Sequence, residues 1–184
     1  MTLVFTDASS AILLHKAELF VPAIQAFSMV VSKAVFREIT VPGYPGAGMF
    51  KEVRKQKGFI IENPTEEAMG PILSADKSFA RMDIGERETL ALFYHHQKKG
   101  GNNFVLMDDG RGARFCQKQN IPYINALLVP KLFWYSGFMD QITAHKNTNQ
   151  LIDLGRYSEK IIQIAQQLTE KDLAPFIPEI THGN

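Results

Sequence analysis

Four acidic residues stand where side chains from separate segments of the chain could meet. Asp7 and Asp108 each follow a short apolar run, whereas Glu38 lies late in the segment SKAVFREI and Glu86 near the start of a long segment with helical patterning. Carboxylates held close together repel one another unless a cation or protons compensate. Oxygen ligands with water-filled positions suit Mg²⁺ or Mn²⁺, which can lower the pKa of water and stabilise charge on a phosphodiester. Convergence of these acids would therefore form a divalent-metal site.

Short apolar runs and the segments between them predict the elements that must position these acids. Five runs rich in β-forming residues predict strands at 2–6, 28–31, 59–61, 104–107 and 121–124. Helices are expected from near Ala11 with Ser9 or Ser10 as cap, at 17–26, 32–39, 49–57, from Pro64, at 84–98 and at 110–119. Further helices are expected at 127–137, 139–146 and 156–168, before a loose tail over the last dozen residues. Continuously apolar strands that alternate with helices predict an α/β fold with a parallel sheet covered on both faces.

The positions of two acids in this pattern support a shared site. In parallel sheets of this kind the functional crevice lies outside the carboxyl ends of the strands. Asp7 and Asp108 directly follow two of the predicted strands. An N-cap role for Asp7 and a D-x-x-E capping box of Asp83 with Glu86 remain open as structural alternatives. Asp109 is expected to cap the next helix and, with Asp83 and Ser9, is a reserve candidate for the site.

Composition narrows the class of protein. The 184 residues fit one domain with a helical extension, and 45% hydrophobic residues suffice for a core. A charged fraction of 21% and a net charge of +1 argue against a disordered tail or a histone-like binder. The single cysteine, Cys116, excludes an internal disulfide framework. The expected location of the protein is therefore a reducing cytoplasm. Neither an apolar run of about 18 residues nor a signal-peptide pattern is found, so no membrane association is expected.

Other candidate residues have structural interpretations beside the functional ones. Arg111 and Arg114 fall at helical spacing, which is typical of a solvated helix face, or alternatively of a phosphate-binding stripe beside Asp108. His95 and His96 are adjacent and cannot share one helix face as zinc ligands. The aromatic residues between 133 and 138 indicate core or a dimer interface.

The sequence resembles the PIN-domain family, which includes the VapC-type toxin ribonucleases. The resemblance covers about residues 2–140 and rests on the segments VFTDASSAILL, SKAVFREI, DIGERETLALFYH and VLMDDGRGARFCQKQNIPYINALLVPKLFWYSGFM. By this resemblance the family's four acids match Asp7, Glu38, Glu86 and Asp108, and its hydroxyl residue matches Ser9 or Ser10. It implies an α/β/α sandwich with a five-stranded parallel sheet in residues 1–140. Residues 141–184 are then a helical C-terminal extension packed on the same domain.

The resemblance also implies a function. A Mg²⁺- or Mn²⁺-dependent endoribonuclease is expected, with RNA as substrate and with a homodimer and a small antitoxin protein as further expectations. Asn125-Ala126 stands where many relatives have a Gly-Thr pair, and this departure favours the alternative of a non-catalytic nucleic-acid-binding or regulatory module. A phosphatase of the haloacid dehalogenase type ranks low, because the triplet Asp7-Ala8-Ser9 lacks the second Asp of its D-x-D motif.

Overall fold

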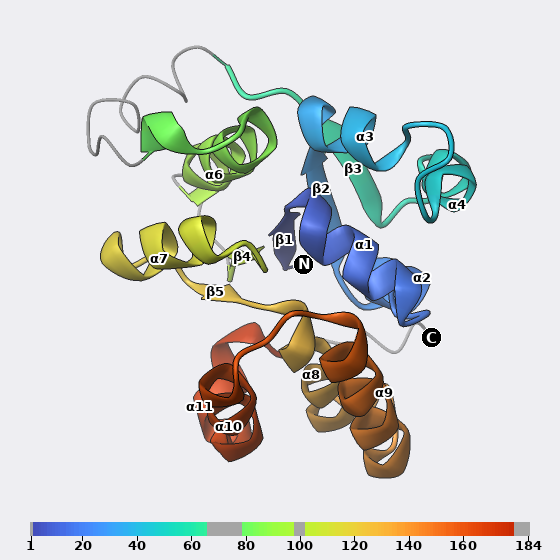
Figure 1. The fold of residues 1–184 in the computed structure, drawn as a ribbon, viewed down its shortest axis with the longest axis vertical. Helices are drawn as coiled ribbons and strands as arrows, with labels where there is room; N and C mark the ends of the chain where they lie inside the picture. The colour runs from blue at the N-terminus through green and yellow to red at the C-terminus, as the bar shows by residue number, and fades with distance from the viewer. Residues whose placement is uncertain (1, 66–78, 98–101, 179–184) are drawn as a thin grey trace.

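Five parallel strands form one sheet at the centre of the molecule. The computed structural model describes residues 2–65, 79–97 and 102–178. The strands are β1 (Leu3–Thr6), β2 (Ser28–Ser32), β3 (Phe59–Glu62), β4 (Phe104–Leu106) and β5 (Tyr123–Ile124), and their spatial order is β3-β2-β1-β4-β5 (Figure 1). The predicted parallel sheet of an α/β/α sandwich is therefore confirmed.

The direction in which the chain adds strands reverses between β1 and β4. From β1 the chain moves outward to β2 and β3, and it then returns to place β4 on the other side of β1. The register pairs Thr6 with Leu106, and the Asp7 N–H donates to the Leu106 carbonyl at 3.2 Å. Asp7 and Asp108 therefore lie beside each other at the switch point, where loops of an open α/β sheet leave a crevice.

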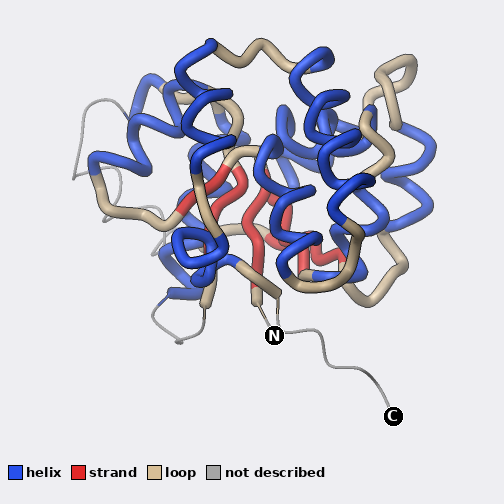
Figure 2. Tube along the Cα trace, turned by 90° about the horizontal axis from the view of Figure 1, so that it is seen from below, coloured by secondary structure: helices blue, strands red, loops and turns tan. Residues whose placement is uncertain are grey.

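Helices cover both faces of the sheet, as Figure 2 shows. They are α1 (Ala8–Lys16), α2 (Phe20–Ala26), α3 (Lys33–Ile39), α4 (Ala47–Val53), α6 (Ile84–Gln97), α7 (Gly110–Lys118), α8 (Val129–Tyr135), α9 (Gln141–Leu154), α10 (Glu159–Gln167) and α11 (Glu170–Leu173). Short 3₁₀ turns are η1 (Phe79–Arg81), η2 (Ala126–Leu128) and η3 (Ala174–Phe176). None of the helices in the described ranges is long and apolar enough to cross a membrane.

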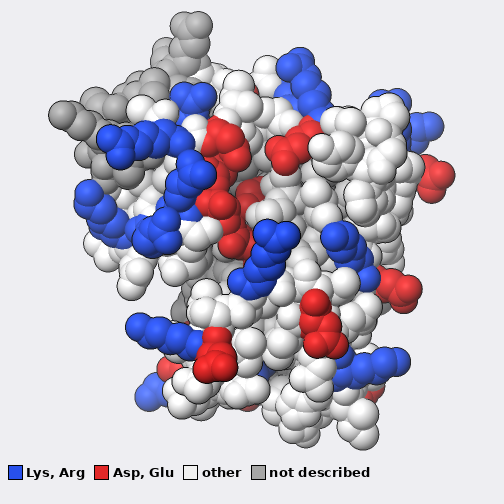
Figure 3. Space-filling view, in the orientation of Figure 1, with Lys and Arg blue, Asp and Glu red and all other residues white. Residues whose placement is uncertain are grey.

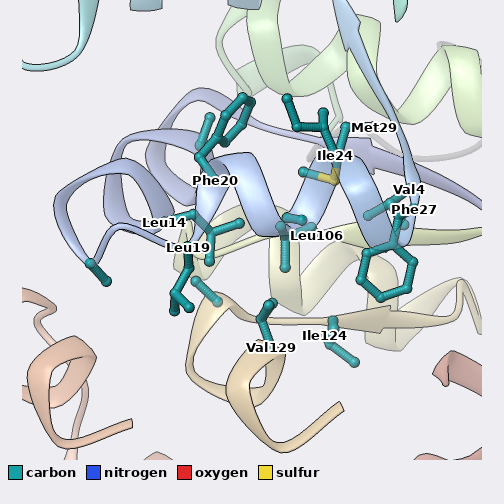
Figure 4. Close-up of a cluster of buried hydrophobic side chains, with 14 of the residues drawn as sticks. Val4, Leu14, Leu19, Phe20, Ile24, Phe27, Met29, Leu106, Ile124 and Val129 are labelled. Atoms are coloured by element: carbon teal, nitrogen blue, oxygen red, sulfur yellow. The ribbon is translucent and has the colours of Figure 1, made fainter. Parts of the chain in front are cut away.

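Successive strand residues enter two separate cores, because side chains along a strand point to opposite faces. Val4, Met29 and Leu106 pack with α1, α2 and α8 in the larger core, part of which Figure 4 shows. Phe5 and Val105 belong to the second core, which contains residues of α6 and α7. Burial on both faces explains why the strands are apolar throughout rather than alternating with polar residues.

Several predicted boundaries are wrong. Helix α1 begins at Ala8 rather than near Ala11, because Asp7 caps it. Helix α9 is longer than the predicted 139–146, since Asp140 caps its start and it continues to Leu154. The start of the expected tail is ordered, because α11 and η3 reach Phe176 and Leu173 is buried. The helix expected from Pro64 falls largely on residues 66–78, outside the described ranges.

The C-terminal helices share the larger core. Leu151 of α9 and Ala165 of α10 are buried in it. The Lys131 Nζ donates to the carbonyls of Ala165, Gln166 and Leu168 at 2.8, 3.0 and 2.8 Å. A cation at carbonyls that have no partner within their own helix is a favourable C-terminal cap. This contact fixes the end of α10 against α8.

Candidate metal centre

Asp7 is a buried carboxylate that also caps a helix. Its side chain is 3% exposed, its Oδ1 accepts from the Ser10 N–H at 2.8 Å, and its Oδ2 accepts from the Ser9 Oγ at 2.6 Å. Burial and the charge of Asp108 together raise the pKa of Asp7 to about 7, although these hydrogen bonds act in the opposite direction. The capping role left open by the sequence is present, and it holds the carboxylate at the switch point.

Asp108 lies beside Asp7 at the end of the segment that contains β4. Its Oδ2 accepts from the Ala126 N–H at 2.9 Å, and its Oδ1 accepts from the Tyr157 hydroxyl at 2.5 Å. Burial raises the pKa of Asp108, while the hydrogen bonds act in the opposite direction. No motif or periodicity in the sequence marks Tyr157, a single tyrosine between α9 and α10 that lies 49 residues from Asp108.

Glu86 is buried in the first turn of α6, with 6% of its surface exposed. The Glu86 N–H donates to Asp83 Oδ1 at 2.8 Å, and the Asp83 N–H donates to Glu86 Oε2 at 3.2 Å. This is the capping box predicted from the sequence. Burial raises the pKa of Glu86 to about 8, together with its hydrogen bond to Asp109 and the charges of Asp109 and Asp83. Glu86 therefore combines a structural role with an unusual tendency to keep its proton.

Asp109 is the side-chain hydrogen-bond partner of Glu86. As N-cap of α7 it accepts from the N–H groups of Arg111 and Gly112 at 2.7 and 3.3 Å. Burial acts to raise its pKa, but the hydrogen bond with Glu86 and these backbone bonds hold the pKa below its usual value. The pKa values of Glu86 and Asp109 are thus displaced in opposite directions, so Glu86 is the member of the pair that binds a proton more readily.

Carboxylates from four segments line one cavity of about 90 Å³. The described residues around it are Asp7, Ala8, Ser9, Glu38, Asp83, Gly85, Glu86 and Asp109. The structure thus brings three of the four predicted acids together with the three reserve candidates. None of these described residues is basic, so no side chain among them neutralises the carboxylates.

Glu38 reaches the cavity from α3, although its side chain is largely exposed. Burial and the charge of Asp83 raise the pKa of Glu38. Gly85 permits the close approach of α6 to α3, because a Cβ there would lie 3.2 Å from Val35 Cγ2 and 3.7 Å from Glu38 Oε2. A larger residue at Gly85 would therefore require Val35 to shift by a few tenths of an ångström, whereas its distance to Glu38 is an ordinary van der Waals contact.

Asp108 instead faces a larger groove of about 870 Å³ beside the cavity. Ser9 and Asp109 line both hollows, so the two are adjacent. The groove has an apolar lining from α1, from the ends of β4 and β5 and from α10, with the cationic residues Lys16 and Arg156 at its edge. Such a hollow can hold a chain segment longer than the acidic cavity could accept.

The donor set fits a hard divalent cation by its chemistry. The raised pKa values show that the charged forms of these clustered carboxylates are disfavoured, and a bound cation would compensate their negative charge. The Ser10 Oγ is also buried without a hydrogen bond of normal geometry, yet lies near enough to Asp7 and Asp108 to lower the pKa of both. Over residues 2–65, 79–97 and 102–178, however, no three Asp, Glu, His or Cys side chains are arranged to ligate one ion together. Carboxylates other than Asp108, whose two oxygens are held by hydrogen bonds, therefore have to reorient to enclose a cation.

Basic residues flank the acids. Figure 3 shows acidic side chains in a stripe over the middle of one face, with basic side chains beside it. Arg111 and Arg114 are both exposed on α7, and the Arg111 guanidinium donates to the Arg81 carbonyl at 3.3 Å. Both arginines are thus available to an anionic ligand near Asp109.

The histidine and cysteine candidates lie apart from this chemistry. The His96 Nε2 pairs with Glu62 Oε2 at 2.9 Å. Cys116 is fully buried, and burial together with the charge of Asp7 raises the pKa of its thiol to about 12. These contacts give His96 a structural role, and a thiol with such a pKa remains protonated near neutral pH.

Comparison with known proteins identifies a family. The family model described as "PIN domain" matches residues 3–171, which is most of the chain and extends through α9 and α10. Neither the curated proteins nor the solved structures include a significant match.

Proposed function

Because the chain belongs to the PIN-domain family, we propose that it is a Mg²⁺- or Mn²⁺-dependent endoribonuclease. Its proposed metal-binding and catalytic acids are Asp7, Glu38, Glu86 and Asp108, with Asp83 and Asp109 beside them. The observation that carries the proposal is the cavity at the sheet's switch point. Five carboxylates line it, and none of its described lining residues is Lys, Arg or His. Nuclease-type folds are expected in this family, and the clustered carboxylates of the cavity support the proposal of metal-dependent chemistry.

The reaction is hydrolysis of an RNA phosphodiester, in which water attacks phosphorus and the 3′-oxygen leaves. A divalent ion supplies a lowered water pKa and charge stabilisation when it is bound. Ser9 and Ser10 hold the two oxygens of Asp7, and Ala126 holds one oxygen of Asp108. Glu86, with a pKa of about 8, can hold or release a proton at neutral pH, as a general acid or base must.

The groove and the arginines provide a path for the substrate. Lys16 and Arg156 line the groove next to Asp108, and Arg111 and Arg114 project from α7 beside the acids. Cations at such positions contact phosphates, while an apolar lining suits unpaired bases. We therefore place an RNA strand along the groove with its scissile phosphate at the acidic cavity.

The buried and exposed apolar residues also support proposals for the domain organisation and the partners. We propose a PIN-like domain in residues 1–140 with 141–184 as an extension packed on it, supported by the burial of Leu151 and Ala165 in the larger core.

A homodimer is proposed through the corner of α8 and α9, where Phe138 is 37% and Ile142 82% exposed. A small antitoxin is the partner class if the protein is a toxin, and a cytoplasmic location is consistent with the buried free thiol of Cys116.

The test is cleavage of single-stranded and structured RNAs by the purified protein with Mn²⁺ or Mg²⁺. Asp7→Asn and Asp108→Asn should abolish cleavage, and Glu52→Gln is the matched control because Glu52 is exposed on α4, away from the cavity. Cleavage that persists in both Asn variants would overturn the assignment.

One observation favours a second candidate, a non-catalytic RNA-binding module. Both oxygens of Asp108 already accept hydrogen bonds, and the acids within the described ranges do not enclose an ion. This candidate is supported if the protein binds RNA with strong salt dependence but cleaves none with either ion.

A further inference from the structure

Tyr157 connects the C-terminal helices to the candidate metal centre. It lies in the linker between α9 and α10, and its hydroxyl donates to Asp108 Oδ1 at 2.5 Å. The Ala126 N–H holds the other oxygen at 2.9 Å. Asp108 therefore has both oxygens fixed, one by the main chain of the sheet's own loop and one by a side chain 49 residues further along.

The linker is built around this tyrosine ring. Gly155 precedes it, and a Cβ at Gly155 would lie 2.3 Å from Tyr157 Cε2 and 2.9 Å from the Leu151 carbonyl oxygen. Contacts this short do not occur between real atoms, so any side chain at Gly155 would displace the ring. The backbone thus approaches the ring as closely as only glycine permits.

Both ends of the linker are fastened. The Gly155 N–H donates to the Leu151 carbonyl at 2.8 Å, and the Ser158 Oγ caps α10 by accepting from the Ile161 N–H at 3.4 Å. Lys131 holds the far end of α10 through three carbonyls. The hydroxyl of Tyr157 is therefore presented to Asp108 from a fixed frame rather than from a free loop.

We propose that Tyr157 is a positioning residue of the metal centre and acts through Asp108. With Ala126 it fixes the plane of the carboxylate, so that the lone pairs left over remain directed for ligation instead of turning toward solvent. Hydrogen bonds from such partners orient ligands and tune metal affinity. The inference rests on the proposed function for the identity of the ion, a divalent cation. It makes the C-terminal helices part of the site, in line with a family match that extends to residue 171.

The test measures Mn²⁺ binding to the full-length protein by calorimetric titration. Tyr157→Phe keeps the ring and removes the donor, and should weaken Mn²⁺ binding roughly ten-fold, as loss of a supporting hydrogen bond does. In an Asp108→Asn background the same change should have no further effect. Tyr44→Phe is the matched control, because Tyr44 is 53% exposed and away from both hollows. Gly155→Ala, which displaces the ring, should reproduce the weakening with the hydroxyl still present.

The outcomes separate this inference from the proposed function. Wild-type protein that binds Mn²⁺ but cleaves no RNA would overturn the ribonuclease and leave the positioning role standing if Tyr157→Phe weakens binding. Tighter binding in Tyr157→Phe would show that the tyrosine masks Asp108, and unchanged binding would show that it does not act on the site. Either result overturns the positioning role, as does wild-type protein that binds no Mn²⁺. If the wild type cleaves RNA, the kcat of Tyr157→Phe should fall while its KM for RNA stays near the wild-type value.

Discussion

A side-chain hydrogen bond joins Glu86, in the first turn of α6, to Asp109, the N-cap of α7, at the acidic cavity. Burial and the hydrogen bond to Asp109 raise the pKa of Glu86 to about 8, and that bond helps to hold the pKa of Asp109 below its usual value. Two carboxyl groups whose pKa values are displaced in opposite directions can divide acid and base roles between them. Asp109, a reserve candidate in the sequence, is therefore coupled directly to Glu86.

The metal-free protein should lose stability as the pH rises from about 4 to about 8. The folded-state pKa values of Asp7 and Glu86, about 7 and about 8, lie above those of the unfolded chain. Their protons therefore stabilise the native state; this contribution is complete below the unfolded pKa and is lost as the pH passes the folded pKa. We expect Mn²⁺ to raise Tm more at pH 8 than at pH 5.5, relative to EDTA. Thermal unfolding checks this, and an equal rise at both pH values contradicts it.

Asp7→Asn should abolish RNA cleavage without unfolding the protein. The amide oxygen can still accept from the Ser10 N–H, which keeps the cap of α1, while the buried charge and its repulsion with Asp108 are removed. We expect activity to fall by about two orders of magnitude or more, because a removed charge deprives the site of a ligand. The metal-free variant should match or exceed the wild type in free energy of unfolding at pH 8, measured in urea. A large loss of stability would instead assign Asp7 a mainly structural role.

Gly58→Ala should destabilise the fold severely. A Cβ at Gly58 would lie 1.9 Å from the Ile24 carbonyl oxygen. The backbone at the end of α2 would have to move to relieve this overlap, which costs free energy. We expect a loss of about 3 kcal/mol or more, in the range of severe overpacking. Gly48→Ala is the control, since a Cβ there meets nothing within 4 Å and alanine favours the helix. Urea unfolding of both variants is the measurement, and similar midpoints would contradict the close packing of Gly58 against Ile24.

Lys131→Met should loosen α10 selectively. The ammonium group serves three carbonyls at the end of that helix, and burial lowers its pKa. Loss of hydrogen bonds to a charged group costs about 1 to 3 kcal/mol. Hydrogen exchange should accelerate in α10 and the Tyr157 linker while β1 and β4 stay protected. Uniform acceleration over the whole chain would instead indicate global destabilisation.

Arg111→Gln combined with Arg114→Gln should weaken RNA binding at every sequence tested. Each lost phosphate contact makes the negative slope of log affinity against log salt shallower by about 0.7 for a single strand. Both arginines are exposed on α7, so the fold should not change. Binding titrations over a salt series test this, with Lys51→Gln and Lys55→Gln near α4 as the control pair. An unchanged slope in the α7 variant would assign these arginines to solvated surface.

The sequence alone determined the fold class and the neighbourhood of the site. Apolar runs separated by helical segments are local patterns, and they sufficed to predict five parallel strands and the strand-end places of Asp7 and Asp108. The capping chemistry of Asp7 and of Asp83 with Glu86 was also readable, because capping depends on residues within one turn.

Only the tertiary structure decided how the acids are divided between the two hollows. Asp109 lines both hollows and reaches Glu86, whereas Asp108 lines the groove alone, and adjacent residues in a sequence give no sign of which one turns where. The contact of Tyr157 with Asp108 joins positions 49 residues apart and depends on how α9 and α10 pack. Local pattern specifies elements and their caps, but the direction of a side chain at a site depends on packing between elements that are distant in the chain.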